Sequence, residues 1–263
     1  MKEYYSQEIT DPSLDELREL ARWYNKTLGN HPIIVGGWAV YLYARGLGSK
    51  DIDMVFPDAK SMHVTLAYYF ASHGYSEKRT SMFDKEFVKK VKTERMEVEI
   101  IVDAVAANRI IQIKSGKVSI PWSWVKKNCV DKDIGKAILY IPTLEALLSY
   151  KLGAILGRNE QLRQASDPGQ VQHFRSKVWK DVYDAISLSQ FEVDQKKIEG
   201  FLAESGMDKY REEIMQIIED NYDAEIEGLL SGIPISKIRK IVTGSGDNPI
   251  TTKTPGVYNP RYS

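Results

Sequence analysis

The most informative segment of the sequence runs from residue 33 to residue 56 and reads IIVGGWAVYLYARGLGSKDIDMVF. Its two apolar runs, residues 33–35 and 51–56, predict short strands, with a helix over about residues 38–45 between them. Asp51 and Asp53 flank Ile52 in the second run. Because strand side chains alternate between faces, both carboxylates point the same way, with Cα atoms about 6.6 Å apart. This strand end is therefore a candidate site for one or two divalent cations.

A glycine pair, Gly36-Gly37, lies where the first strand turns into the helix. Glycine leaves the backbone N–H groups uncovered, and a helix N-terminus favours negative charge, so a phosphate can dock there. A phosphate cradle beside a metal-binding pair of carboxylates predicts phosphoryl or nucleotidyl transfer.

Composition narrows the class of protein. A chain of 263 residues that is 43% hydrophobic has room for one or two globular domains with a sizeable core. Lys plus Arg equals Asp plus Glu, at 36 each, which argues against a strongly basic nucleic-acid binder but leaves a local basic patch open. The single cysteine, Cys129, excludes an internal disulfide and a Cys-rich zinc site. With no apolar leader and no membrane-length run, we expect a soluble cytoplasmic protein without membrane contact.

The rest of the chain predicts an α+β fold. Ser13 and Glu16 form a capping-box pattern that predicts a helix from residue 13 to about residue 28. The other expected strands are residues 87–91, 96–102, 110–113, 118–120 and 137–141, and the other expected helices are residues 59–72, 143–157, 174–188, 194–204 and 208–221. Residues 158–172 are expected to form a loop, and the chain beyond Lys240 an irregular tail. We therefore expect a catalytic domain over residues 1–142, with a small mixed β-sheet and flanking helices, and a helical domain over residues 143–263.

The glycine pair, the short helix and the segment Ser49-Lys50-Asp51-Ile52-Asp53 together resemble the signature of the DNA polymerase β-like nucleotidyltransferase superfamily. The match is closest to the abortive-infection and type IV toxin nucleotidyltransferases and covers about residues 30–188. The resemblance implies that Asp51 and Asp53 are catalytic ligands of Mg²⁺ or Mn²⁺. It also implies that Gly36, Gly37 and Ser49 bind the phosphates of a nucleotide, although the superfamily's Gly-Ser pair is Gly-Gly here.

The superfamily also has a third carboxylate on a neighbouring strand. Glu97, Glu99 and Asp103 share one face of the strand predicted over residues 96–102 and its continuation. The superfamily pattern is an acid followed by apolar residues, so the resemblance favours Glu99 as the third catalytic and metal-binding acid. Glu97 and Asp103 remain the alternatives.

Two helical motifs complete the resemblance. Lys151 and Arg158 lie in KLGAILGR, which resembles the toxin family's K-x-x-A-x-x-x-R helix, and their shared helix face implies contact with the triphosphate. The segment Asp181-Val182-Tyr183-Asp184 resembles its D-x-Y-D element. There Asp184 is expected to be catalytic, either orienting Lys151 or Arg158 or acting as a base. The alternative is a solvated helix face with a structural ion pair.

The expected reaction moves a nucleoside monophosphate from an NTP to an acceptor hydroxyl. The resemblance leaves three hypotheses open: a toxin-like enzyme acting on RNA, such as a tRNA end, with an antitoxin protein as partner; an enzyme that modifies an antibiotic or another small molecule; and a non-catalytic relative that binds nucleotide or a protein partner. The four histidines have no metal-ligand spacing and are expected to be structural. Trp122 and Trp124 are expected in the core, with base stacking as the alternative.

Overall fold

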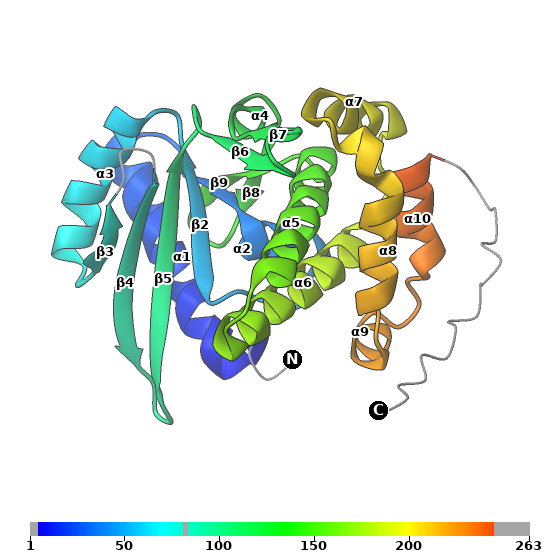
Figure 1. Cartoon of the computed structure of the whole chain (residues 1–263). Helices are drawn as coiled ribbons and strands as arrows, with labels where there is room; N and C mark the ends of the chain where they lie inside the picture. The colour runs from blue at the N-terminus through cyan, green and yellow to red at the C-terminus, as the bar shows by residue number, and fades with distance from the viewer. Residues whose placement is uncertain (1–4, 81–83, 245–263) are drawn as a thin grey trace.

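A mixed β-sheet forms the centre of the computed structural model, which describes residues 5–80 and 84–244 (Figure 1). Within these residues, seven strands run in the order β3-β4-β5-β2-β1-β9-β8, and β6 and β7 form a separate hairpin. The strands are β1 (Ile33–Val35), β2 (Asp51–Phe56), β3 (Ser76–Thr80), β4 (Asp84–Lys92), β5 (Glu97–Ala106), β6 (Ile110–Ile113), β7 (Val118–Pro121), β8 (Cys129–Asp133) and β9 (Ile138–Pro142).

Strand β2 occupies the middle of this sheet. It pairs antiparallel with β1 and parallel with β5, and this register sets Asp53 directly opposite Asp103. In β5 every second residue from Val98 to Ala106 is buried, whereas the alternate residues lie on the opposite face and are less buried. Because a slip of one residue would turn this apolar set toward solvent, burial fixes the register of β5 against β2.

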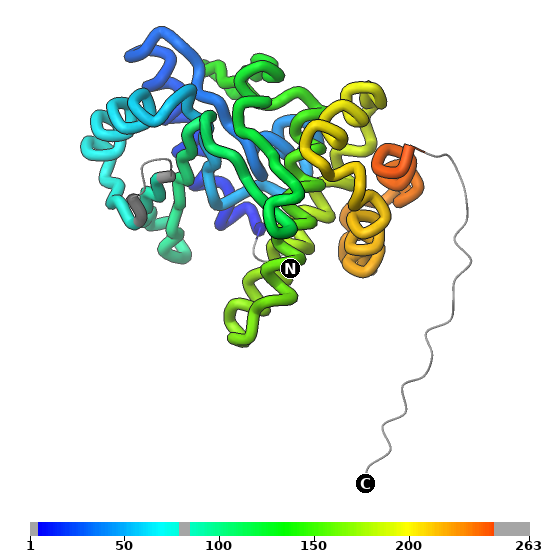
Figure 2. The backbone as a smooth tube through the Cα atoms, turned by 45° about the horizontal axis from the view of Figure 1, so that its top comes forward, coloured from blue at the N-terminus to red at the C-terminus, as the bar shows by residue number. Residues whose placement is uncertain are grey.

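Helices cover the sheet and extend beyond it. α1 and α3 pack against β2 and β5, and α2 packs against β1 and β2. α5 and α6 lie against each other, between the sheet and the group α7–α10 (Figures 1 and 2). The helices are α1 (Gln7–Leu28), α2 (Gly36–Ala44), α3 (Ala59–Ser72), α4 (Ser123–Lys127), α5 (Leu144–Gln164), α6 (Pro168–Leu188), α7 (Gln195–Ser205), the 3₁₀ helix η2 (Met207–Tyr210), α8 (Arg211–Asn221), α9 (Ala224–Leu229) and α10 (Ile235–Thr243).

One continuous hydrophobic core joins the sheet and the helices that follow it. It includes Trp38 and Phe56 from the first half of the chain and Leu152, Val182 and Ile218 from the second. Packing therefore continues across Pro142, where the sheet ends. No helix among the described residues is long and apolar enough to span a membrane.

The start of α1 differs from the prediction. The helix begins at Gln7, one turn and a half earlier than the expected capping box. Ser13 is buried and accepts a hydrogen bond of 3.0 Å from the Trp38 indole, while Glu16 pairs with Lys89 at 2.6 Å. The capping-box interpretation was wrong because both side chains bond to other elements rather than to the helix end.

The predicted loop over residues 158–172 is also mostly helical. α5 continues to Gln164, and α6 begins at Pro168 after a short connection. Asp167 caps α6 by accepting a hydrogen bond of 2.9 Å from the Gln170 N–H. Asp before Pro is a helix-start signal, because Pro suits the first helical position. α10 extends three residues past Lys240, and the expected tail from residue 245 onward lies outside the described residues.

Candidate active site

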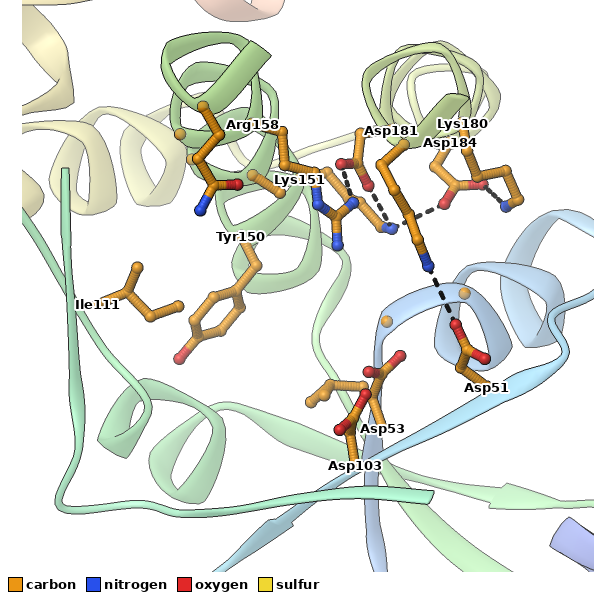
Figure 3. Close-up of a pocket in the computed structure, with 18 of the residues that line it drawn as sticks. Asp51, Asp53, Asp103, Ile111, Tyr150, Lys151, Arg158, Lys180, Asp181 and Asp184 are labelled. Carbon is orange, nitrogen blue, oxygen red and sulfur yellow. Dashed lines mark hydrogen bonds and ion pairs between the residues drawn. The ribbon is translucent and has the colours of Figure 1, made fainter. Parts of the chain in front are cut away.

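A pocket of about 600 Å³ opens where the sheet meets α5 and α6. Its floor is formed by β2, β5 and the first turn of α2, its opposite wall by α5 and α6, and one end by the β6–β7 hairpin (Figure 3). Most of the site residues expected from the sequence line it: Gly36, Gly37, Ser49, Asp51, Asp53, Lys151, Arg158, Asp181 and Asp184.

Three acidic residues, Asp51, Asp53 and Asp103, lie on the floor of the pocket, and we call them the acidic cluster. Asp53 and Asp103 sit side by side (Figure 3), as their positions opposite each other on parallel strands require. Burial raises the pKa of Asp53, and the neighbouring negative charge of Asp51 raises it further. Such crowding of carboxylates favours the binding of a cation.

Glu99 lies outside this pocket. It faces Lys90 in the adjacent strand, and its carboxylate pairs at 3.1 Å with Lys78 of β3. Four residues of strand, about 13 Å, separate it from Asp103. The structure thus places Asp103, rather than the expected Glu99, beside Asp53, because the pairing of β5 with β2 sets which acid reaches the floor. Glu97, which pairs with Lys90 at 3.0 Å, is also outside the pocket.

The glycine pair lets two side chains approach the backbone closely. Gly36 has a φ of +65°, and a Cβ at this position would overlap the Asp53 carboxylate. A Cβ on Gly37 would lie 2.8 Å from the Cβ of Ser49. Ser49 is buried, and its hydroxyl accepts a hydrogen bond of 3.3 Å from the Asp51 N–H. Ser49 therefore also positions the start of β2, in addition to lining the pocket.

Five charged side chains on α5 and α6 form what we call the ion-pair network: Lys151, Arg158, Lys180, Asp181 and Asp184 (Figure 3). The Lys151 ammonium lies 3.0 Å from Asp181 and 2.7 Å from Asp184. Arg158 pairs with Asp181, and Lys180 with Asp184. Both carboxylates are fully buried, so each needs the cations around it.

This network shifts the pKa values of Asp181 and Lys151. Burial alone would raise the pKa of Asp181, but Arg158 and Lys151 outweigh burial and hold that pKa below its usual range. Burial likewise opposes the charge of Lys151, yet Asp184 and Asp181 raise its pKa above the ordinary value. Lys151 and Asp181 are therefore a charged pair across the usual pH range.

Several pocket residues were not expected from the sequence. Lys177 of α6 reaches across the pocket to Asp51, with 3.0 Å between the Lys177 Nζ and the Asp51 Oδ2. His173, one turn earlier, also lines the pocket, although it was expected to be structural. His173 and Lys177 are four residues apart on α6, but the expected helix began only at residue 174, so no signal in the sequence joined them. Burial and the charge of Lys177 lower the pKa of His173.

The tryptophans have different surroundings. Trp124 is buried, as expected, and its indole N–H donates to Glu204 at 2.9 Å. Trp122 is half-buried at the hairpin end of the pocket and stacks on Tyr150, with ring centroids 4.8 Å apart. Trp122 thus lines the pocket, where base stacking was the alternative to a place in the core, whereas Trp124 does not.

The acidic cluster offers the type of ligand atom that a divalent cation needs. Carboxylate oxygens are the ligands that Mg²⁺ and Mn²⁺ prefer. The Oδ1 atom of Asp51 is buried and has no hydrogen-bond partner, so a ligand atom is available. Nevertheless, no three acidic, His or Cys side chains within residues 5–80 and 84–244 are arranged as a ready-made metal site.

Comparison with known proteins finds similar folds only. No family model matches the chain, and no curated protein matches its sequence. The chain is similar to an antigenic nucleotidyltransferase-like protein of Paracoccidioides brasiliensis, with 13% identity, a TM-score of 0.45, and coverage of 84% of this chain and 98% of that one. Against JHP933 of Helicobacter pylori, the identity is 11%, the TM-score 0.47, and the coverage 89% and 91%. For ANT(2″)-Ia, solved with adenylyl-2″-tobramycin, the identity is 12% and the TM-score 0.42, and the match covers 76% of this chain and 99% of that one.

Proposed function

We propose that the protein is a metal-dependent nucleotidyltransferase that moves a nucleoside monophosphate from an NTP to an acceptor hydroxyl and releases pyrophosphate. The observation that carries this proposal is one pocket with opposite charges on its two walls. Acidic side chains of β2 and β5 form the floor, and cations of α5 and α6 lie across from them. This arrangement suits a polyphosphate, which needs a divalent cation on one side and basic side chains on the other.

Asp51, Asp53 and Asp103 would hold Mg²⁺ or Mn²⁺. When bound, such a cation neutralises phosphate charge and favours ionisation of the attacking hydroxyl. The first turn of α2, at Gly36 and Gly37, presents N–H groups and the positive end of the helix dipole to a phosphate. We propose that these elements orient the α-phosphate toward the acceptor.

The ion-pair network supplies positive charge to the opposite wall. The side chain of Arg158 is 36% exposed, so its guanidinium can contact the triphosphate while it remains paired with Asp181. The side chain of Lys151 is only 9% exposed and lies between two carboxylates. We therefore propose that Arg158 contacts phosphate and that Lys151 chiefly fixes the network. Asp184 would position Lys151 and Lys180 rather than accept the proton of the acceptor.

For the acceptor, we propose RNA, such as a tRNA end, by a toxin-like enzyme with an antitoxin partner. The support is that the two segments that resemble the toxin-like K-x-x-A-x-x-x-R and D-x-Y-D motifs contact each other in a single network at this pocket. A small molecule such as an antibiotic is the second candidate acceptor. A non-catalytic nucleotide binder is the third alternative, and the experiment below separates all three.

The test is transfer of label from each α-³²P-labelled NTP, with Mg²⁺ or Mn²⁺, to total RNA in one arm and to a panel of hydroxylated antibiotics in another. Asp103→Asn should lower transfer by about a hundredfold or more. Glu99→Gln is the matched control, an acid on the same face of β5, and should keep full activity. An inactive Glu99→Gln variant beside an active Asp103→Asn variant would overturn the proposed site. Calorimetric NTP binding without transfer to any acceptor would identify a binding protein instead.

A further inference from the structure

The ion pair between Lys177 and Asp51 crosses the candidate active site. It joins α6 to the first residue of β2, and the dashed line that ends on Asp51 in Figure 3 marks it. The Asp51 side chain is mostly buried, and that of Lys177 is 28% exposed. The Lys177 ammonium thus already contacts one oxygen of the acidic cluster.

This contact gives Asp51 a different partner from the other two acids. Asp53 and Asp103 lie together in Figure 3, whereas the Asp51 carboxylate stands apart and meets the ammonium group. Asp51 and Asp53 share one face of β2 with Cα atoms about 6.6 Å apart, so both carboxylates can approach one cation from the same side. Among the described residues, these three acids are not arranged as a ready-made three-ligand metal site.

We propose that Lys177 is an exchangeable cation, which occupies Asp51 in the empty enzyme and moves to the phosphates of the nucleotide when a divalent cation takes its place. This inference rests on the proposed nucleotidyltransferase function. Lysine suits the role because its ammonium is a point charge on a flexible stem without fixed bonding geometry. The partial exposure of Lys177 leaves room for the side chain to swing.

The exchange makes Lys177 oppose metal binding and assist nucleotide binding. Without nucleotide, a metal ion that binds Asp51 competes with Lys177 for the charge of this carboxylate, and the displaced ammonium gains no new partner. With nucleotide present, the displaced ammonium gains a charge-assisted contact with phosphate. Metal and nucleotide therefore favour each other's binding, and this coupling must be reciprocal.

Lys177→Met tests the proposal, because Met keeps most of the length of the side chain and removes its charge. Lys89→Met is the matched control: Lys89 is similarly exposed and pairs at 2.6 Å with Glu16, outside the pocket. Binding of Mn²⁺ to the nucleotide-free protein is measured by electron paramagnetic resonance. Binding of a non-hydrolysable NTP with Mg²⁺ is measured by calorimetry.

We expect Lys177→Met to bind Mn²⁺ about five- to tenfold more tightly and the nucleotide about tenfold more weakly than the parent. Lys89→Met should match the parent in both. Asp51→Asn should abolish the gain in Mn²⁺ affinity, so the double variant should bind Mn²⁺ no better than Asp51→Asn alone. Opposite signs of the two effects are the signature of exchange.

Unchanged or weaker Mn²⁺ binding by Lys177→Met would overturn the proposal, and so would undetectable Mn²⁺ binding by every variant. A lower melting temperature with both affinities unchanged would show that the ion pair only anchors α6. Tighter Mn²⁺ binding together with an absence of transfer to any acceptor would have a different meaning: Lys177 would compete with the metal, whereas the proposed transferase function would fail.

Discussion

Gly36 shows how a single missing side chain shapes the site. Its φ of +65° lies in the region that glycine adopts freely, and the Asp53 carboxylate occupies the space where a Cβ would be. The two requirements are separate, since one concerns the backbone and the other a neighbouring side chain. A substitution at Gly36 should therefore have two costs.

Gly36→Ala should lower stability and metal affinity together. Gly29→Ala is the matched control, since Gly29 has a φ of +61° and no heavy atom within 4 Å of its Cβ position. We expect Gly29→Ala to lose about 1–2 kcal/mol from backbone strain and to bind Mn²⁺ as the parent does. Gly36→Ala should lose more and bind Mn²⁺ at least about tenfold more weakly. Thermal melts and Mn²⁺ titration provide the measurements, and equal losses in the two variants would contradict this account.

At the residue scale, the sequence indicated Asp51 and Asp53, offered Asp103 only as an alternative to Glu99, and did not indicate Lys177. Spacing of two within one strand is local information, so the first pair could be recognised directly. The identity of the third acid depends on how β5 pairs with β2, and no local pattern near Glu99 or Asp103 predicts that register. Lys177 meets Asp51 only because α6 packs over the sheet end, so no local pattern predicted the contact.

At the scale of elements, α5 and α6 are joined by the buried ion-pair network as well as by apolar packing. The pKa of Asp181 is held below its usual range because Arg158 and Lys151 outweigh the effect of burial. A carboxyl group with a lowered pKa in the folded state stabilises the fold above its unfolded pKa, near 4. That stabilisation is lost as the pH falls through the lower, folded pKa.

Asp181→Asn should test this linkage. At pH 7 the variant should lose about 3–5 kcal/mol of unfolding free energy, because Lys151 and Arg158 keep buried charges without one of their carboxylates. Below pH 4 the loss should shrink, since the parent protonates Asp181 as it unfolds. Urea unfolding from pH 3 to pH 7 measures both. A loss that stays constant with pH would show that the Asp181 charge does not stabilise the fold.

The helix boundaries around this network were predicted only in part. The 3.6-residue pattern of apolar side chains indicated α5 and α6, but the polar run after Arg158 was interpreted as a loop. α5 continues over this run to Gln164, with Gln161, Arg163 and Gln164 exposed, because a helix end that projects from the core needs no apolar face. The Asp167-Pro168 signal fixed the start of α6, and local sequence alone contained it.

At the scale of the whole molecule, the expected boundary between residues 142 and 143 coincides with the end of β9 and the start of α5. The hydrophobic core is continuous across that point and includes Leu152 and Val182 together with residues of the sheet. The sequence change from strands to helices was visible, but the sharing of one core was not, because it arises from long-range packing.

We expect calorimetry of the whole chain to show a single unfolding transition, with calorimetric and van't Hoff enthalpies equal. The physical reason is that separating the helices from the sheet would expose core side chains of both parts. As a second measurement, far-ultraviolet circular dichroism of a fragment ending at residue 142 should lack a cooperative melt. Two resolved transitions in the whole chain, or a folded fragment, would instead support two independent domains.

The central position of β2 has a consequence for how the candidate active site loses its structure. Its backbone is bonded to strands on both sides, β5 and β1, so its amides should exchange with deuterium only when the entire protein opens. We therefore expect no local unfolding of the floor of the site below the melting temperature. Under the proposed function, adaptation to cold or to a new acceptor would have to occur in the helices and the hairpin opposite, where side chains such as Lys177 are partly exposed.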